Sequence, residues 1–97
     1  MDFLVHMEVH ADVSAETVHG LTADEARRAR ELADEGMMLR LWRVPGRRAN
    51  WGIWSAETAD ELHAALASLP LFPFMTMTVH LLARHPNDPG LPLGGEV

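Results

Sequence analysis

Hydrophobic and polar residues alternate along two stretches of the chain, one close to each end. In residues 3–9 one parity is apolar throughout, whereas the other includes His6 and Glu8. Residues 75–83, MTMTVHLLA, alternate in the same way. A period of two puts successive side chains on opposite faces of a strand, so both stretches are predicted to be strands with two unlike faces.

Apolar residues recur every three or four positions in two other stretches, which predicts two helices. The first covers residues 14–35, and Gly36 is expected to end it. The second begins at Thr58, which forms a capping box with Glu61, and it stops at Pro70.

Between these helices, residues 37–44 and 48–54 are strand-like and flank the turn sequence PGR, which predicts a hairpin. The order strand, helix, two strands, helix, strand predicts an α+β ferredoxin-like βαββαβ sandwich. Its four-stranded antiparallel sheet carries two helices on one face, and the first strand lies beside both the third and the fourth. We expect one such domain over residues 1–86 and a proline- and glycine-rich C-terminal arm over residues 87–97.

Two helices on one side leave the other face of the sheet uncovered. With three tryptophans, three phenylalanines and six methionines in 97 residues, we expect too much exposed apolar area for a monomer. The sequence therefore predicts a homo-oligomer. The segment LPLFPFM, residues 69–75, adds a proline-stiffened wall of large apolar side chains, which is expected to face a pocket or a neighbouring subunit.

Composition removes several classes of function. A balance of 8 basic to 14 acidic residues, net −6, disfavours a nucleic acid partner. The apolar runs are too short to span a membrane and the start does not resemble a signal peptide, so we expect a cytoplasmic location. The chain has no cysteine and no lysine, which excludes thiolate and Schiff-base chemistry. Acid–base chemistry and bidentate binding of carboxylates by arginine remain.

Glu25 is the residue most suggestive of catalysis. Helical spacing from Leu21 through Glu25 to Ala29 places this carboxylate on the apolar stripe of the first helix. Two interpretations are open. Glu25 either completes a capping box with Thr22, where the helix would restart near Gly20, or it is a desolvated general base with a raised pKa.

Histidines gather on one face of the predicted sheet. His6, Glu8 and His10 share a face of the first strand, and His80 shares that of the neighbouring last strand. Such groups can bind zinc, but no supporting pattern surrounds them, so we expect no metal. His6, near the middle of its strand, is a candidate for transferring a proton or polarising an oxygen.

Half of the arginines lie on the predicted hairpin, at Arg40, Arg43, Arg47 and Arg48. They are interleaved with Trp42 and Trp51, so they either form charged edges with cation–π contacts or build a local site for a small carboxylate ligand. Which of these arginines points inward depends on the register of the hairpin.

The strings LWRVPGRRANWGIW, ELHAALASLPLFPFM and VHLLARHP resemble the muconolactone δ-isomerase family in order and spacing. FLVHMEV near the start and ADE in the first helix fit the same pattern. The resemblance extends over residues 1 to about 86, and the pieces LWRVPGRRAN and LPLFPFM are its most specific signals.

This resemblance implies the ferredoxin-like fold, assembly into homo-oligomers (decamers), and no cofactor. It also implies a reaction, the shift of the ring double bond of muconolactone to give 3-oxoadipate enol-lactone, in the breakdown of catechol through the β-ketoadipate pathway. That chemistry needs a base for the acidic ring proton, stabilisation of the dienolate oxygen, and return of a proton two carbons away.

On this chain the resemblance makes Glu25 the proton carrier, with His6 as a second catalytic candidate. Asn50 would donate a hydrogen bond to the lactone carbonyl. The candidates for holding the substrate carboxylate or the developing oxyanion are Arg40, Arg43 and Arg47. Apolar walls that exclude water are expected from Trp42, Trp51, Phe72 and Phe74.

Other readings stay open, because His6 and Arg47 stand where this family usually has lysine and histidine. A related isomerase, a dehalogenase like the 5-chloromuconolactone dehalogenases, or a biosynthetic ring-modifying enzyme would use the same scaffold on another small unsaturated lactone or acid. A non-catalytic oligomeric ligand binder is a further alternative.

Overall fold

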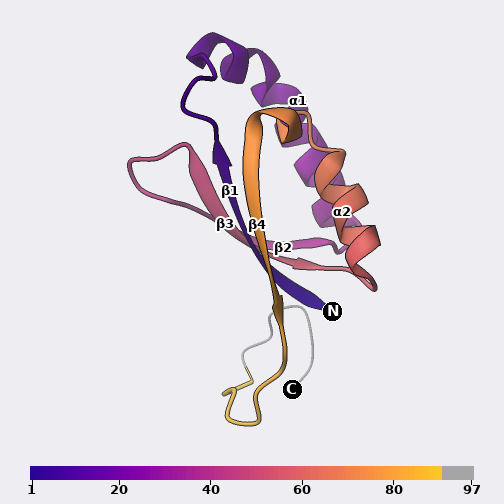
Figure 1. Cartoon of the computed structure of the whole chain (residues 1–97). Helices are drawn as coiled ribbons and strands as arrows, with labels where there is room; N and C mark the ends of the chain where they lie inside the picture. Colours follow the sequence, from indigo (N-terminus) through magenta and orange to yellow (C-terminus); the bar gives the residue numbers. More distant parts are fainter. Residues whose placement is uncertain (91–97) are drawn as a thin grey trace.

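A computed structural model of the chain describes residues 1–90 (Figure 1). Its elements are β1 (Asp2–Val9), α1 (Ala15–Asp34), β2 (Met38–Arg43), β3 (Ala49–Ser55), α2 (Ala59–Ala67), a 3₁₀ turn (Phe72–Phe74) and β4 (Met75–Leu82). The order matches the prediction. Residues 83–90 contain neither helix nor strand, and the rest of the predicted C-terminal arm, residues 91–97, lies outside the described residues.

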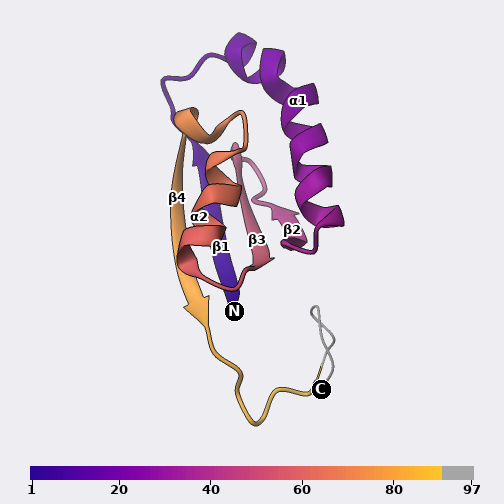
Figure 2. The ribbon, with the colours of Figure 1, turned by 90° about the vertical axis from the view of Figure 1, so that its right-hand side faces the viewer.

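The four strands form one antiparallel sheet in the order β2-β3-β1-β4. Both helices lie on the same side of this sheet (Figure 1). The predicted ferredoxin-like plan is therefore confirmed, including the central place of β1 between β3 and β4. Turned by 90°, the ribbon shows β3 behind the space between α1 and α2, with α2 beside β4 and α1 beside β2 (Figure 2).

The hydrophobic core lies between the sheet and the helices. Phe3, Val5 and Met7 of β1 are at most 3% exposed, as the alternation predicts, because this parity faces the helices. Their neighbours in the core are Leu32, Trp54, Ala56, Leu62, Ala65, Leu66 and Leu69.

The helix ends follow local sequence signals. Ser14 caps α1 by accepting a hydrogen bond from the backbone N–H of Thr17 at 3.1 Å. Thr58 caps α2 by accepting from the N–H of Glu61 at 3.1 Å, which confirms the predicted start of that helix. Gly36 follows α1 with a φ of +80°, a conformation that glycine adopts without strain.

The prediction of a capping box between Thr22 and Glu25 is wrong. The helix α1 is continuous from Ala15 to Asp34, so it does not restart near Gly20. Backbone N–H groups in the middle of a helix are already bonded to carbonyls one turn earlier, which leaves none for a cap. The Thr22 hydroxyl instead donates to the carbonyl of Val18 at 2.9 Å.

No helix within residues 1–90 combines the length and the apolar character that a membrane span requires.

Candidate active site

Glu25 lies half-buried in the middle of α1, on the side of the helix that faces the rest of the domain. Its Oε1 accepts a hydrogen bond from the backbone N–H of Leu71 at 2.9 Å. Burial raises the pKa of Glu25 above its ordinary value, and the Leu71 hydrogen bond opposes this rise without cancelling it. A carboxyl group with a raised pKa on a fixed support has the properties of a general base.

The segment LPLFPFM explains how Glu25 is held. After α2, Leu71 is 8% exposed and precedes the 3₁₀ turn Phe72–Phe74, which leads directly into β4. Phe72 is half-buried, and its ring meets the ring of His63 edge-on at 6.0 Å. The stiff, apolar connection between α2 and β4 thus places the Leu71 N–H against the Glu25 carboxylate. It also carries the aromatic side chain of Phe72, the next residue in the sequence.

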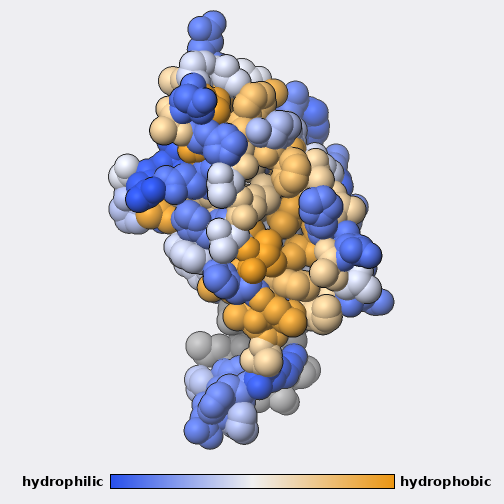
Figure 3. Space-filling model, viewed as in Figure 1, coloured by the Kyte–Doolittle hydropathy of each residue, from blue (hydrophilic) through white to orange (hydrophobic). Residues whose placement is uncertain are grey.

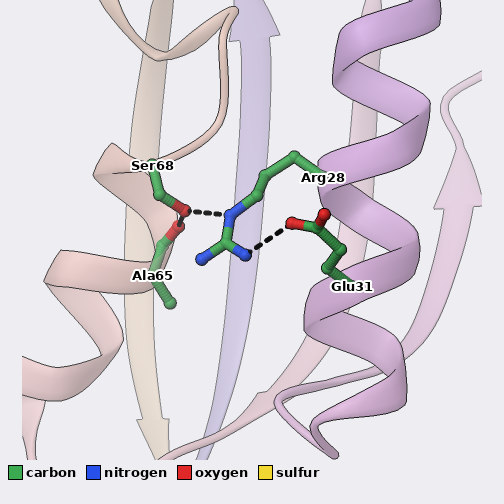
Figure 4. Close-up of polar contacts among 4 residues, drawn as sticks. All are labelled: Arg28, Glu31, Ala65 and Ser68. Atoms are coloured by element: carbon green, nitrogen blue, oxygen red, sulfur yellow. Dashed lines mark hydrogen bonds and ion pairs between the residues drawn. The ribbon is translucent and has the colours of Figure 1, made fainter.

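A second polar contact joins the same two parts of the domain. Arg28, one turn after Glu25, donates from Nε to the Ser68 hydroxyl at 2.8 Å and from its terminal nitrogen to Glu31 at 2.8 Å (Figure 4). The Ser68 hydroxyl in turn donates to the carbonyl of Ala65 at 2.6 Å. Together with the Glu25–Leu71 hydrogen bond, these contacts fix α1 against the end of α2.

Cross-strand register settles which hairpin residues face the helices. Asn50 pairs with Met7, whose side chain is buried in the core, so Asn50 faces the helices too. Arg43 pairs with Asn50 on the edge strand β2 and shares that side of the sheet, although it is exposed. Glu25, Asn50 and Arg43 therefore belong to the same side of the sheet.

The other parity faces away from the helices. His6 pairs with Trp51, their ring centroids 4.6 Å apart, and Trp51 stacks on His80 at 6.5 Å. Trp42 pairs with Trp51, and the guanidinium of Arg40 lies 4.7 Å from the Trp42 ring. We call these five residues the open-face cluster. Within one chain, the sheet separates His6 from Glu25.

Arg47 and Phe74 lie near the C-terminal end of β1, where the chain also turns between β2 and β3. Arg47 forms an ion pair with Glu8, with Nε 3.0 Å from its carboxylate, and both line a hollow of about 590 Å³. Phe74 lines a second hollow of about 420 Å³ with Val13 and Ser14. Glu25 lines neither of these hollows.

Arg48, the fourth hairpin arginine, has a structural partner. Its guanidinium donates to the backbone carbonyls of His10 at 2.7 Å and Val13 at 2.8 Å, which holds the loop between β1 and α1. Within residues 1–90, no three histidine, aspartate or glutamate side chains gather closely enough to hold a metal ion.

Sequence reasoning missed Trp54. It is 1% exposed, and its indole Nε1 is buried with no hydrogen-bond partner among the described residues. The carboxamide oxygen Oδ1 of Asn50 is also buried with no hydrogen-bond partner among these residues. A signal was present in the pattern N-x-G-x-W at positions 50–54, which puts an amide, a missing side chain and an indole on one face of a strand.

Comparison with known proteins identifies relatives of this chain. The chain matches the profile of the family described as Muconolactone delta-isomerase over residues 1–88. A Muconolactone Delta-isomerase 2 of Acinetobacter lwoffii and a Muconolactone Delta-isomerase of Cupriavidus pinatubonensis are each 40% identical to it over 90 residues. These matches cover 91% of this chain, and 94% and 98% of the two relatives.

Solved structures give the same result. A crystal structure of muconolactone isomerase is similar with a TM-score of 0.79 and 37% identity, over 91% of this chain and 94% of that one. The 5-chloro-2-hydroxyhydroquinone dehydrochlorinase of Burkholderia phenoliruptrix has a TM-score of 0.72 at 15% identity, over 88% of this chain and 96% of that one, and shares the fold alone. The chain belongs to the muconolactone delta-isomerase family.

Proposed function

We propose that this chain isomerises muconolactone to 3-oxoadipate enol-lactone by general acid–base catalysis. The observation that carries the proposal is the half-buried Glu25 carboxylate, whose pKa is raised by burial and whose position is set by the Leu71 N–H. The relatives that are 40% identical carry the name of this activity, which supports the choice of substrate.

In the proposed reaction Glu25 removes the acidic ring proton from the carbon that bears the carboxymethyl arm. The electron pair of that bond spreads through the ring double bond onto the lactone carbonyl oxygen, giving a dienolate. The protonated Glu25 then returns a proton to the ring carbon two positions away, which shifts the double bond and regenerates the carboxylate. A base with a raised pKa suits both steps, because it accepts the proton in the first step and, once protonated, releases it in the second.

The remaining groups on the helix-facing side would bind and polarise the substrate. Arg43, which shares the helix-facing side of the sheet with Asn50, would pair with the carboxylate arm through its planar guanidinium. Asn50 would donate a hydrogen bond from its Nδ2 to the lactone carbonyl. Phe72 and the apolar core beside it would keep water away from the dienolate.

The open-face cluster has a different proposed role. Trp42 and Trp51 are 44% and 37% exposed, and Leu82, which pairs with Asp2 at the end of β4, is 39% exposed on the same face. Leu81, 65% exposed, pairs with Phe3 and lies on the other side of this edge strand, and Figure 3 shows apolar atoms gathered over this part of the molecule. We propose that further copies of this chain cover these surfaces in a homo-oligomer, so that His6, Arg40 and their neighbours lie at a subunit contact. A Trp51→Glu variant that sediments like the wild type would contradict this proposed homo-oligomer.

We also propose the cytoplasmic location that the sequence predicts.

Proton transfer in deuterated water tests the proposed reaction. Purified protein is incubated with muconolactone in D₂O without added metal or nucleotide, and ¹H NMR follows the ring protons. We expect conversion to the enol-lactone and deuterium at the carbon that receives the proton. If neither deuterium uptake nor conversion exceeds the rate without protein, the proposed activity is wrong. Tight lactone binding without either would instead identify a non-catalytic binder.

A further inference from the structure

Two buried polar atoms on β3 have no hydrogen-bond partner among residues 1–90. They are the indole Nε1 of Trp54 and the carboxamide Oδ1 of Asn50. Folded proteins pair nearly all buried polar groups, so each exception needs an explanation. An unpaired buried donor destabilises the fold, and this cost is understandable if a ligand provides the missing partner.

The geometry of β3 puts the two residues on the same side of the sheet. Asn50, Gly52 and Trp54 alternate along the strand and share its helix-facing side. A Cβ atom on Gly52 would lie 2.8 Å from Trp54 Nε1, so the indole nitrogen occupies the space above Gly52, on the side toward Asn50. Of the two unpaired atoms only the indole nitrogen is a donor, so it is the group that a ligand oxygen on this side of β3 would meet.

Glu25 lies at the same end of the domain. Its hydrogen-bond partner Leu71 comes four positions before Met75, the first residue of β4, which pairs with Val9 of β1. Asn50 pairs with Met7, two residues from Val9. Both Glu25 and Asn50 thus belong to the end of the sheet where β1 finishes and β4 begins.

Methionines line the core on this side of the sheet. Met7 pairs with Met77 across β1 and β4, while Met38 and Met75 also pack against the core. Methionine is flexible and adapts to irregular partners, so these side chains are suited to packing against a small ring.

We infer that the Trp54 indole N–H binds the ring carbonyl oxygen of the substrate and stabilises the negative charge that develops there, whereas the unpaired Asn50 Oδ1 is an acceptor and does not contact that oxygen. This inference rests on the proposed function and names the substrate class more closely, as small rings that carry a carbonyl acceptor. A ring without that oxygen leaves a buried donor unpaired and is rejected for that reason.

NMR of the indole protons tests the contact directly. In the Glu25→Gln variant, which is expected to bind muconolactone without converting it, ¹⁵N-labelled tryptophan side chains give separate N–H signals, and the Trp54→Phe variant assigns one of them. Saturating muconolactone should move the Trp54 signal downfield, as for a proton that gains a hydrogen bond. If the Leu71 backbone amide responds to muconolactone while the Trp54 indole signal stays in place, the inference is wrong.

Kinetics give a second measurement. Trp54→Phe keeps an aromatic ring and removes the donor, so kcat should fall about 100-fold, as for loss of one oxyanion donor, while KM changes by less. The smaller ring leaves a cavity in the core, so circular dichroism must show that the variant is folded at the assay temperature. A kcat within twofold of the wild type would overturn the inference. If the wild type neither converts muconolactone nor shows any shifted signal, the proposed function itself fails.

Discussion

The carboxylate of Glu25 and the backbone N–H of Leu71 are joined by a 2.9 Å hydrogen bond across 46 positions of the chain. This bond ties the middle of α1 to the connection between α2 and β4. A single N–H donor favours the ionised carboxylate, but burial outweighs it, so the pKa of Glu25 is raised. The structure thus positions the carboxylate firmly and leaves it able to take up a proton.

Glu25→Gln should remove the base and retain the support, because a carboxamide oxygen also accepts the Leu71 N–H. We expect kcat with muconolactone to fall by about 10²–10⁴-fold, the usual value of general base catalysis. Circular dichroism should be unchanged. Glu35→Gln, at the exposed end of α1, is the matched control and should keep the wild-type rate. A Glu25→Gln rate within a few-fold of the wild type would remove Glu25 from the mechanism.

The activity should depend on pH through the same group. The reaction needs ionised Glu25, so kcat/KM should decline as pH falls through its pKa, which burial places above 4.5. The measurement is kcat/KM between pH 4 and 8, with fluorescence to show that the protein stays folded. A midpoint at or below 4.5 would show that the Glu25 carboxyl group is not the titrating base.

Stability should depend on pH with the opposite sign. The folded-state pKa of Glu25 lies above its unfolded value, so its contribution to stability is complete below the unfolded pKa and is lost as pH rises through the folded pKa. Glu25→Gln should therefore melt above the wild type at pH 7, and the difference should shrink toward pH 4. Scanning calorimetry of both proteins at the two pH values checks this. Equal melting temperatures at pH 7 would mean that burial does not penalise the Glu25 charge.

The sequence predicted the local features of this fold because they depend on neighbouring residues. The alternation in β1 and the Thr58–Glu61 cap were confirmed for that reason. The Thr22–Glu25 pattern was wrong because the same spacing also occurs inside a continuous helix, where no backbone N–H is free.

Long-range features were beyond the sequence. The sides on which Arg40 and Arg43 lie depend on the hairpin register, which shifts between Met38 and Arg40. The buried indole of Trp54 depends on the missing side chain of Gly52, two residues away and on the same face.

Changing one arginine on each face of the hairpin tests which face binds the substrate carboxylate. Arg43→Gln should raise KM for muconolactone about tenfold with little change in kcat, because a charge-assisted hydrogen bond to the carboxylate arm is lost from an exposed side chain. Arg40→Gln, on the open face, should have the smaller effect on KM. Steady-state kinetics of the two variants decide the matter. A larger KM effect at Arg40 would place the carboxylate site on the open face.

The close approach of Trp54 to Gly52 makes a stability prediction. A methyl group on Gly52 would lie 2.8 Å from the indole nitrogen and 3.2 Å from the Arg40 carbonyl, and a ring that is 1% exposed has little room to move. Gly52→Ala should therefore destabilise the domain by about 1–3 kcal/mol, the usual cost of overpacking a core.

Gly20→Ala is the matched control, because a Cβ there meets nothing within 4 Å and the position is inside α1. It should stabilise the fold by about 0.5–1 kcal/mol through the better helix propensity of alanine. Urea unfolding of the two variants measures both values. A Gly52→Ala variant as stable as the wild type would mean that the Trp54 indole moves aside easily, which would also weaken its assignment as a fixed donor.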